Sequence, residues 1–166
     1  MLMRLRPLVI TLCCLAVAGC GVTEPMPREG PPRLLSFVSS GFGGTTVEVR
    51  LVGDTVVASS RPWDAVGPVQ ETRRVVAAEE WETFWRAVRA AGVRGWPAAC
   101  HNPDVVDGGG FTFELAWADA RRTGSYSNAY PTPAGSCSRD PGYTPAASAF
   151  VDAVLALGVP ATDAAR

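Results

Sequence analysis

The stretch FTFELAW, residues 111–117, indicates the fold that we expect for this chain. Its large apolar residues occupy every second position, and the residues between them are polar or small. This alternation predicts a strand that buries one face in a core. TTVEVRL, residues 45–51, alternates in the same way. Gly53-Asp54 then predicts a two-residue turn into a partner strand at residues 55–60.

Two other segments have the apolar periodicity of helices. The first covers residues 79–91, where four apolar residues follow helical spacing: Trp81, Phe84, Trp85 and Val88. The second begins at Pro145 with Thr144 as its N-cap and ends at Gly158. Further strands are expected at residues 34–38, 71–77 and 122–128. Because strands and helices do not alternate regularly, we expect an α+β fold, a small antiparallel sheet with both helices packed on one face.

The N-terminal residues have the pattern of a secretory leader. Arg4 and Arg6 precede an apolar run over residues 8–18, which is much shorter than the roughly 20 residues of a membrane-spanning helix. The last residues of the run and the two that follow it read Val17-Ala18-Gly19-Cys20. This motif resembles the lipobox of bacterial lipoproteins, although Val17 replaces the more usual leucine.

The resemblance implies cleavage before Cys20 and attachment of diacylglyceryl and palmitoyl groups to that residue. Two or more acyl chains hold a protein stably on a bilayer. The protein would then be anchored in the cell envelope on the extracytoplasmic side, at the outer membrane if the cell is Gram-negative. An alternative is ordinary signal-peptidase cleavage after Ala16-Val17-Ala18, before Gly19, which would release a soluble secreted protein.

These observations give a simple expected organisation. Residues 1–19 form a signal peptide, and residues 20–32 contain the lipidated cysteine and a flexible tether rich in proline. Residues 33–160 form one α+β domain, and residues 161–166 form a disordered tail. The domain is large enough to bury a substantial core.

Cysteine usage also fits export. Once the leader is removed and Cys20 is acylated, Cys100 and Cys137 remain, and two cysteines in an exported domain predict a disulfide. Such a bridge closes a loop of about 36 residues, for which chain entropy predicts about 4 kcal/mol of stabilisation. Two free buried thiols are the alternative.

The charge composition argues against a nucleic-acid-binding role. The chain contains 15 basic residues, all of them arginine, and its formal net charge is −1. Neither a basic stripe nor an acidic tail is present, so a nucleic acid is not an expected partner. The expected partners are the membrane, through the lipid on Cys20, and an envelope protein or glycan.

No catalytic motif stands out, and we expect neither a metal site nor a cofactor. His101 is the single histidine, too few for the multi-histidine sites typical of zinc enzymes. Asp104 and Asp107 lack the spacing of a calcium loop. Glu114 is expected to face outward, because it alternates with apolar residues. An envelope hydrolase with an unrecognised active site remains the alternative to a binding or structural module.

The candidate binding residues lie mainly outside the periodic segments. Aromatic side chains anchor many recognition sites, and small polar neighbours add adaptable contacts. The alternative is that these rings cover the edges of a small core. The candidate set is Trp63, Trp96, Tyr126, Asn128, Tyr130 and Tyr143.

Overall fold

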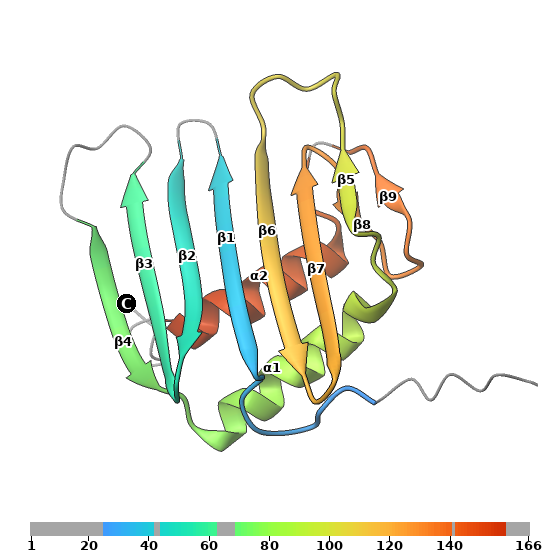
Figure 1. Cartoon of the computed structure of the whole chain (residues 1–166). Coiled ribbons are helices and arrows are strands. Elements are labelled where there is room, and N and C mark those ends of the chain that lie inside the picture. Colours follow the sequence, from blue (N-terminus) through green and yellow to red (C-terminus); the bar gives the residue numbers. More distant parts are fainter. Residues whose placement is uncertain (1–24, 42–43, 63–68, 141, 159–166) are drawn as a thin grey trace, which may run out of the picture.

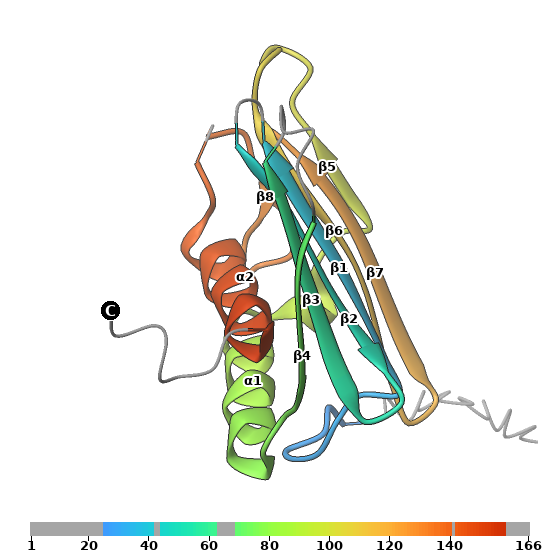
Figure 2. The ribbon, with the colours of Figure 1, turned by 90° about the vertical axis from the view of Figure 1, so that its left-hand side faces the viewer.

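The computed structural model describes residues 25–41, 44–62, 69–140 and 142–158. These residues form a sheet covered on one face by two helices, as Figures 1 and 2 show. The strands of the main sheet are β1 Leu34–Gly41, β2 Thr45–Val52, β3 Thr55–Pro62, β4 Gln70–Val75, β5 Ala99–His101, β6 Gly109–Trp117 and β7 Ala120–Ser127. The helices are α1 Ala78–Ala90 and α2 Pro145–Gly158, with the short 3₁₀ helix η1 Val93–Gly95 after α1. The α+β class is thus confirmed.

The sheet is larger than we expected, and it is mixed. Its seven strands lie in the order β4-β3-β2-β1-β6-β7-β5. Most neighbouring pairs are antiparallel, but β5 pairs with β7 in parallel. The expectation of a small, purely antiparallel sheet was therefore wrong. It missed β5 because a strand of three residues is too short to show periodicity.

The expected strands are present with shifted ends. β1, β3 and β6 are longer than the sequence patterns indicated, and β4 ends before the predicted residue 77. In the long loop before α2, two short strands pair with each other: β8 Tyr130–Pro131 and β9 Cys137–Ser138.

The core lies between the helix layer and the inner face of the sheet. Leu35 and Phe37 of β1 are opposite Leu115 and Phe113 of β6, and all four are buried. The predicted apolar stripe of α1 is buried against them, which confirms that helix face as core. The two helices also pack against each other. The alternating residues of these strands point to the other sheet face, which no helix covers (Figure 2).

Both helix starts have clear physical causes. The Thr144 hydroxyl accepts a hydrogen bond from the backbone N–H of Ala147 at 3.1 Å, so Thr144 is the N-cap of α2 as predicted. In α1 the carboxylate of Glu80 accepts a hydrogen bond from the N–H of Ala77 at 3.0 Å. The helix therefore begins at Ala78, one residue earlier than expected.

The segment before β1 packs closely on the domain. The indole Nε1 of Trp85 donates to the carbonyl oxygen of Gly30 at 2.7 Å, and Pro32 is buried. Residues 25–32 therefore lie against α1, whereas we expected a flexible tether to extend to residue 32. The spacing of prolines and charges gave no sign of this contact, because it depends on isolated hydrogen bonds and a few side chains rather than on a periodic face. Residues 20–24, the signal peptide and the expected tail lie outside the described residues.

Candidate functional site

Three of the expected aromatic binding residues are buried rather than exposed. Trp96 is 5% exposed, Tyr126 2% and Tyr130 1%. The ring of Trp96 packs between strand and helix side chains, with its centroid 5.4 Å from that of Phe150. Tyr143 is half-buried, and its ring centroid lies 4.5 Å from that of Tyr130. The alternative interpretation therefore describes these rings better, since they close the edge of the core.

The hydroxyls of the two buried tyrosines have backbone partners. Tyr126 donates to the carbonyl oxygen of Pro97 at 2.8 Å, and Tyr130 donates to that of Gly109 at 2.6 Å. Burial raises the pKa of both phenols, that of Tyr126 to about 12. A phenol held in this way is neutral at ordinary pH and fixes a loop.

Asn128 also fixes a loop rather than lining a surface. It is 6% exposed and has a φ of 57°, and its Nδ2 donates to the carbonyl oxygen of Val105 at 2.8 Å. Its oxygen atom occupies the space that a side chain at position 108 would need, which explains the glycine there. Trp63, the remaining member of the expected set, lies outside the described residues.

The two cysteines of the domain are brought together. The Sγ atoms of Cys100 and Cys137 are 2.07 Å apart, which is bonding distance. The bridge joins β5 at one edge of the main sheet to β9 in the loop before α2. Cys20, the expected lipidation site, lies outside the described residues.

The polar side chains that the sequence offered for catalysis or metal binding do not form a site. His101, Asp104 and Asp107 are all exposed. Glu114 lies on the open sheet face, where it pairs with Arg121 at 2.6 Å. Among the described residues, no group of three histidine, cysteine, aspartate or glutamate side chains could hold a metal ion.

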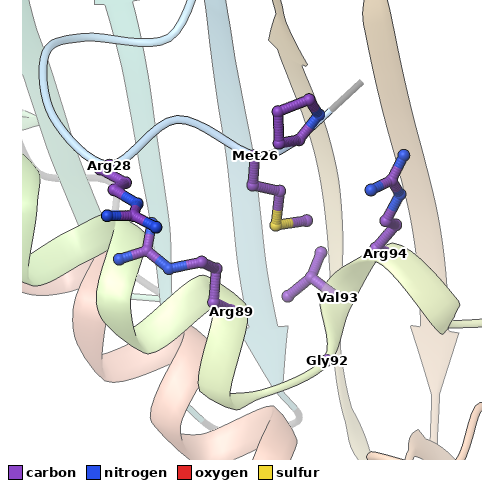
Figure 3. A pocket seen from close by; sticks show the side chains of 7 residues that line it. Met26, Arg28, Arg89, Gly92, Val93 and Arg94 are labelled. Carbon is purple, nitrogen blue, oxygen red and sulfur yellow. The ribbon is translucent and has the colours of Figure 1, made fainter. Parts of the chain in front are cut away.

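A different site lies where the N-terminal segment crosses the end of α1. A hollow of about 360 Å³ is lined by Pro25, Met26, Arg28, Arg89, Gly92, Val93 and Arg94. We call it the arginine pocket. Figure 3 shows Met26 and Val93 at its centre, with Arg28 and Arg89 on one side and Arg94 on the other. Its volume is at the lower end of the range of small-molecule sites.

Local structure explains how these residues meet. Gly92 adopts a φ of 71°, which ends α1 and turns the chain into η1, so that Val93 and Arg94 face the N-terminal segment. A guanidinium nitrogen of Arg89 donates a hydrogen bond to the carbonyl oxygen of Pro27. This bond, together with that of Trp85 to Gly30, holds one wall of the pocket against the other.

The pocket concentrates positive charge. Of the nine other described arginines, five pair with carboxylates: Arg33 with Asp119, Arg50 with Glu48, Arg73 with Glu71, Arg74 with Glu80 and Arg121 with Glu114. The other four, which form no ion pair with a described carboxylate, are Arg61, Arg86, Arg122 and Arg139. Arg28, Arg89 and Arg94 form no ion pair with a carboxylate of the described residues, and none of the residues that line the pocket is acidic. Guanidinium groups around an apolar floor suit an anionic ligand, because their planar forks match carboxylate and phosphate oxygens.

Two other hollows lie on the open sheet face, and neither has an excess of charge of one sign. One, of about 250 Å³, is formed mainly by glycine, serine and threonine residues of β1, β6 and β7. The other, of about 360 Å³, contains two glutamates and two arginines, so its formal charges cancel. The arginine pocket therefore has the most distinctive electrostatics of the three.

Sequence reasoning missed the arginine pocket for a clear reason. Arg28 and Arg94 are far apart in the chain, and Arg28 lies in a segment that resembles a linker. The net charge of the whole chain is close to zero and gives no indication of the local excess of positive charge at the pocket. The available signal was weak: Met26 is an apolar residue within the proline-rich segment, and it packs against the core.

Within the described parts of the chain, no helix is long and apolar enough to span a bilayer. No protein-family model matches the sequence, and no match is found among curated proteins or solved structures.

Proposed function

We propose that this protein is a lipid-anchored module of the cell envelope, on the extracytoplasmic side, that binds an anionic ligand in the arginine pocket. The leader pattern ending at Cys20 supports the anchor. The observation that carries the binding role is the placement of three arginines, none with a described carboxylate partner, around the rim of one hollow whose centre is apolar.

The shape of the pocket defines the chemical class of ligand. Arg28 and Arg94 lie on opposite sides of the hollow, so an anionic group in it has a guanidinium on either side (Figure 3). Met26, which is partly exposed, offers apolar surface to an attached carbon skeleton. A phosphate or carboxylate on a small apolar body therefore fits best, whether it belongs to a free molecule or to a larger envelope component.

Nuclear magnetic resonance tests the binding role directly. We would titrate the mature chain with inorganic phosphate and follow the Nε–Hε signals of its arginines. We expect the signals of Arg28, Arg89 and Arg94 to shift and saturate. Arg61 and Arg139, which are exposed and outside the pocket, serve as internal controls. Uniform small shifts of all arginine signals would mean only general ionic screening and would contradict the proposal.

A double variant gives the matched control. Arg28→Ala with Arg94→Ala removes two guanidinium groups but keeps the hydrogen bond from Arg89 to Pro27. Arg61→Ala with Arg139→Ala removes the same charge elsewhere. We expect phosphate binding to be lost in the first variant and kept in the second.

A further inference from the structure

We infer that the arginine pocket seats the domain on the membrane by binding the phosphate of an anionic phospholipid headgroup. This inference rests on the proposed anchoring through Cys20 and names the source of the anionic group. It would make the pocket a second, electrostatic contact with the bilayer beside the covalent lipid. The domain would then have a fixed orientation rather than a free one.

The length of the chain brings the pocket close to the bilayer. Pro25, which lines the pocket, follows Cys20 by five positions in the sequence. Even a fully extended chain of this length spans only about 18 Å. The headgroup layer of one leaflet adds roughly 5–8 Å to the hydrocarbon core. An acylated Cys20 therefore keeps the pocket within a short reach of lipid phosphates at all times.

The charge of the pocket is complementary to that surface. Anionic lipids attract arginines that lie within a Debye length, about 8 Å at physiological salt. Arg28 and Arg94 have no described carboxylate partner, so their guanidinium groups are available for a phosphate, whereas Arg89 also donates to Pro27. Because the tether also confines the domain, each headgroup is present at a high effective concentration, and weak individual contacts are sufficient.

The rest of the molecule supports this orientation. The N-terminal segment and the connection between β6 and β7 lie together at one end of the sheet, and the end of β3 lies at the opposite end (Figure 1). A domain seated on the arginine pocket would hold the opposite end, including Arg61 in β3, away from the membrane. The two ends thus provide a test surface and a control surface in one chain.

The experiment uses the acylated mature protein in lipid vesicles. A donor dye on Glu29→Cys, an exposed residue beside the pocket, reports the distance to acceptor dyes on lipid headgroups. We compare phosphatidylcholine vesicles with vesicles that also contain phosphatidylglycerol. We expect higher energy transfer on the anionic vesicles and a return to the phosphatidylcholine value in high salt.

The variants make the test specific. Arg28→Ala with Arg94→Ala should lower the ratio of docked to undocked domain by roughly 30-fold, as expected for two arginines near an anionic surface. Energy transfer on anionic vesicles should then fall to the phosphatidylcholine value. Arg61→Ala with Arg139→Ala should leave it unchanged. Circular dichroism of each variant would verify that it is folded.

Three outcomes would overturn the inference. The first is equal energy transfer on both kinds of vesicle, and the second is an equal loss in the control variant. The third is saturable binding of inorganic phosphate with no effect of phosphatidylglycerol, which would assign the pocket to a soluble anion only. That third outcome would leave the proposed binding function intact.

Discussion

Trp85 of α1 donates a hydrogen bond from its indole Nε1 to the carbonyl oxygen of Gly30, at 2.7 Å. The indole ring is fully buried and packs on Trp117 of β6, with the ring centroids 6.0 Å apart. Trp85, a core side chain, thus holds residues 25–32, the segment that precedes β1, against the domain. Since this segment forms one wall of the arginine pocket, the core positions the site.

Replacing Trp85 by phenylalanine should loosen the N-terminal segment. The variant keeps an aromatic ring in the core but loses the hydrogen bond to Gly30, which contributes about 0.5–1.5 kcal/mol. We expect faster amide hydrogen exchange in residues 25–32, measured by mass spectrometry. Trp81→Phe is the control, because Trp81 lies on the same buried face without a hydrogen bond to this segment. Equal exchange in the two variants would contradict the role of the bond.

Removing the bridge between Cys100 and Cys137 should destabilise the domain substantially. The two cysteines are 37 positions apart, and serine at both positions opens the loop that their bridge closes. Chain entropy predicts that the free energy of unfolding falls by about 4 kcal/mol. The check is denaturant unfolding followed by tryptophan fluorescence. Reductant should destabilise the wild-type protein by a similar amount and leave the variant unchanged. A loss below about 1 kcal/mol would show that the bridge contributes little.

The pair of Arg74 and Glu80 should make stability depend on acidic pH. The guanidinium of Arg74 donates a hydrogen bond to Glu80 and lowers the pKa of that carboxyl below its ordinary value of 4.5. A lowered pKa in the folded state stabilises the protein above the unfolded pKa, and this contribution is lost as pH falls through the folded pKa.

Glu80→Gln should therefore lower the free energy of unfolding at pH 7 by up to about 1 kcal/mol, since the pair is partly exposed. The difference from wild type should shrink as pH falls below 4.5. Glu79→Gln, also in the first turn of α1, is the control and should show a smaller difference. A constant difference for Glu80→Gln from pH 7 to pH 3 would count against this account.

Tyr126 should give a second pH dependence, at the alkaline end. Burial raises the pKa of its phenol to about 12, whereas an unfolded tyrosine ionises near 10. The stabilisation from neutral Tyr126 is complete below pH 10 and is lost as pH rises towards 12. Tyr126→Phe should be less stable than wild type at pH 7, because the carbonyl of Pro97 loses its donor. Above pH 10 the difference in the free energy of unfolding between the two proteins should narrow. Urea unfolding at a series of pH values measures this difference, and a constant difference would contradict the raised pKa of Tyr126.

The long elements were predictable because their patterns repeat. β6 and α1 each bury every residue that the alternation or helical spacing marked as apolar and inward. The N-cap of α2 was also predictable, because Thr144 followed by Pro145 has few other interpretations. By contrast, β5 has three residues and pairs in parallel with a distant strand, and such a contact leaves no local signal.

The aromatic residues show where sequence reasoning failed. Tyr126 lies two positions after Gly124 on β7, and both are buried, so the strand alternates as any half-buried strand does. Its ring fills the space over Gly124, where a Cβ atom would lie 2.6 Å from it. Because the inward position before Tyr126 is Gly124 rather than a second large apolar residue, the sequence of β7 shows no apolar alternation around Tyr126. Trp96 follows η1 and belongs to no periodic element.

The central claim is that the domain works at a membrane to which Cys20 anchors it. Intact and peptide mass spectrometry of the protein purified from its native envelope tests this claim most directly. We predict a mature chain that begins at Cys20 and has the added mass of diacylglyceryl and acyl groups on that residue. An unmodified chain that begins at Gly19 would contradict the claim.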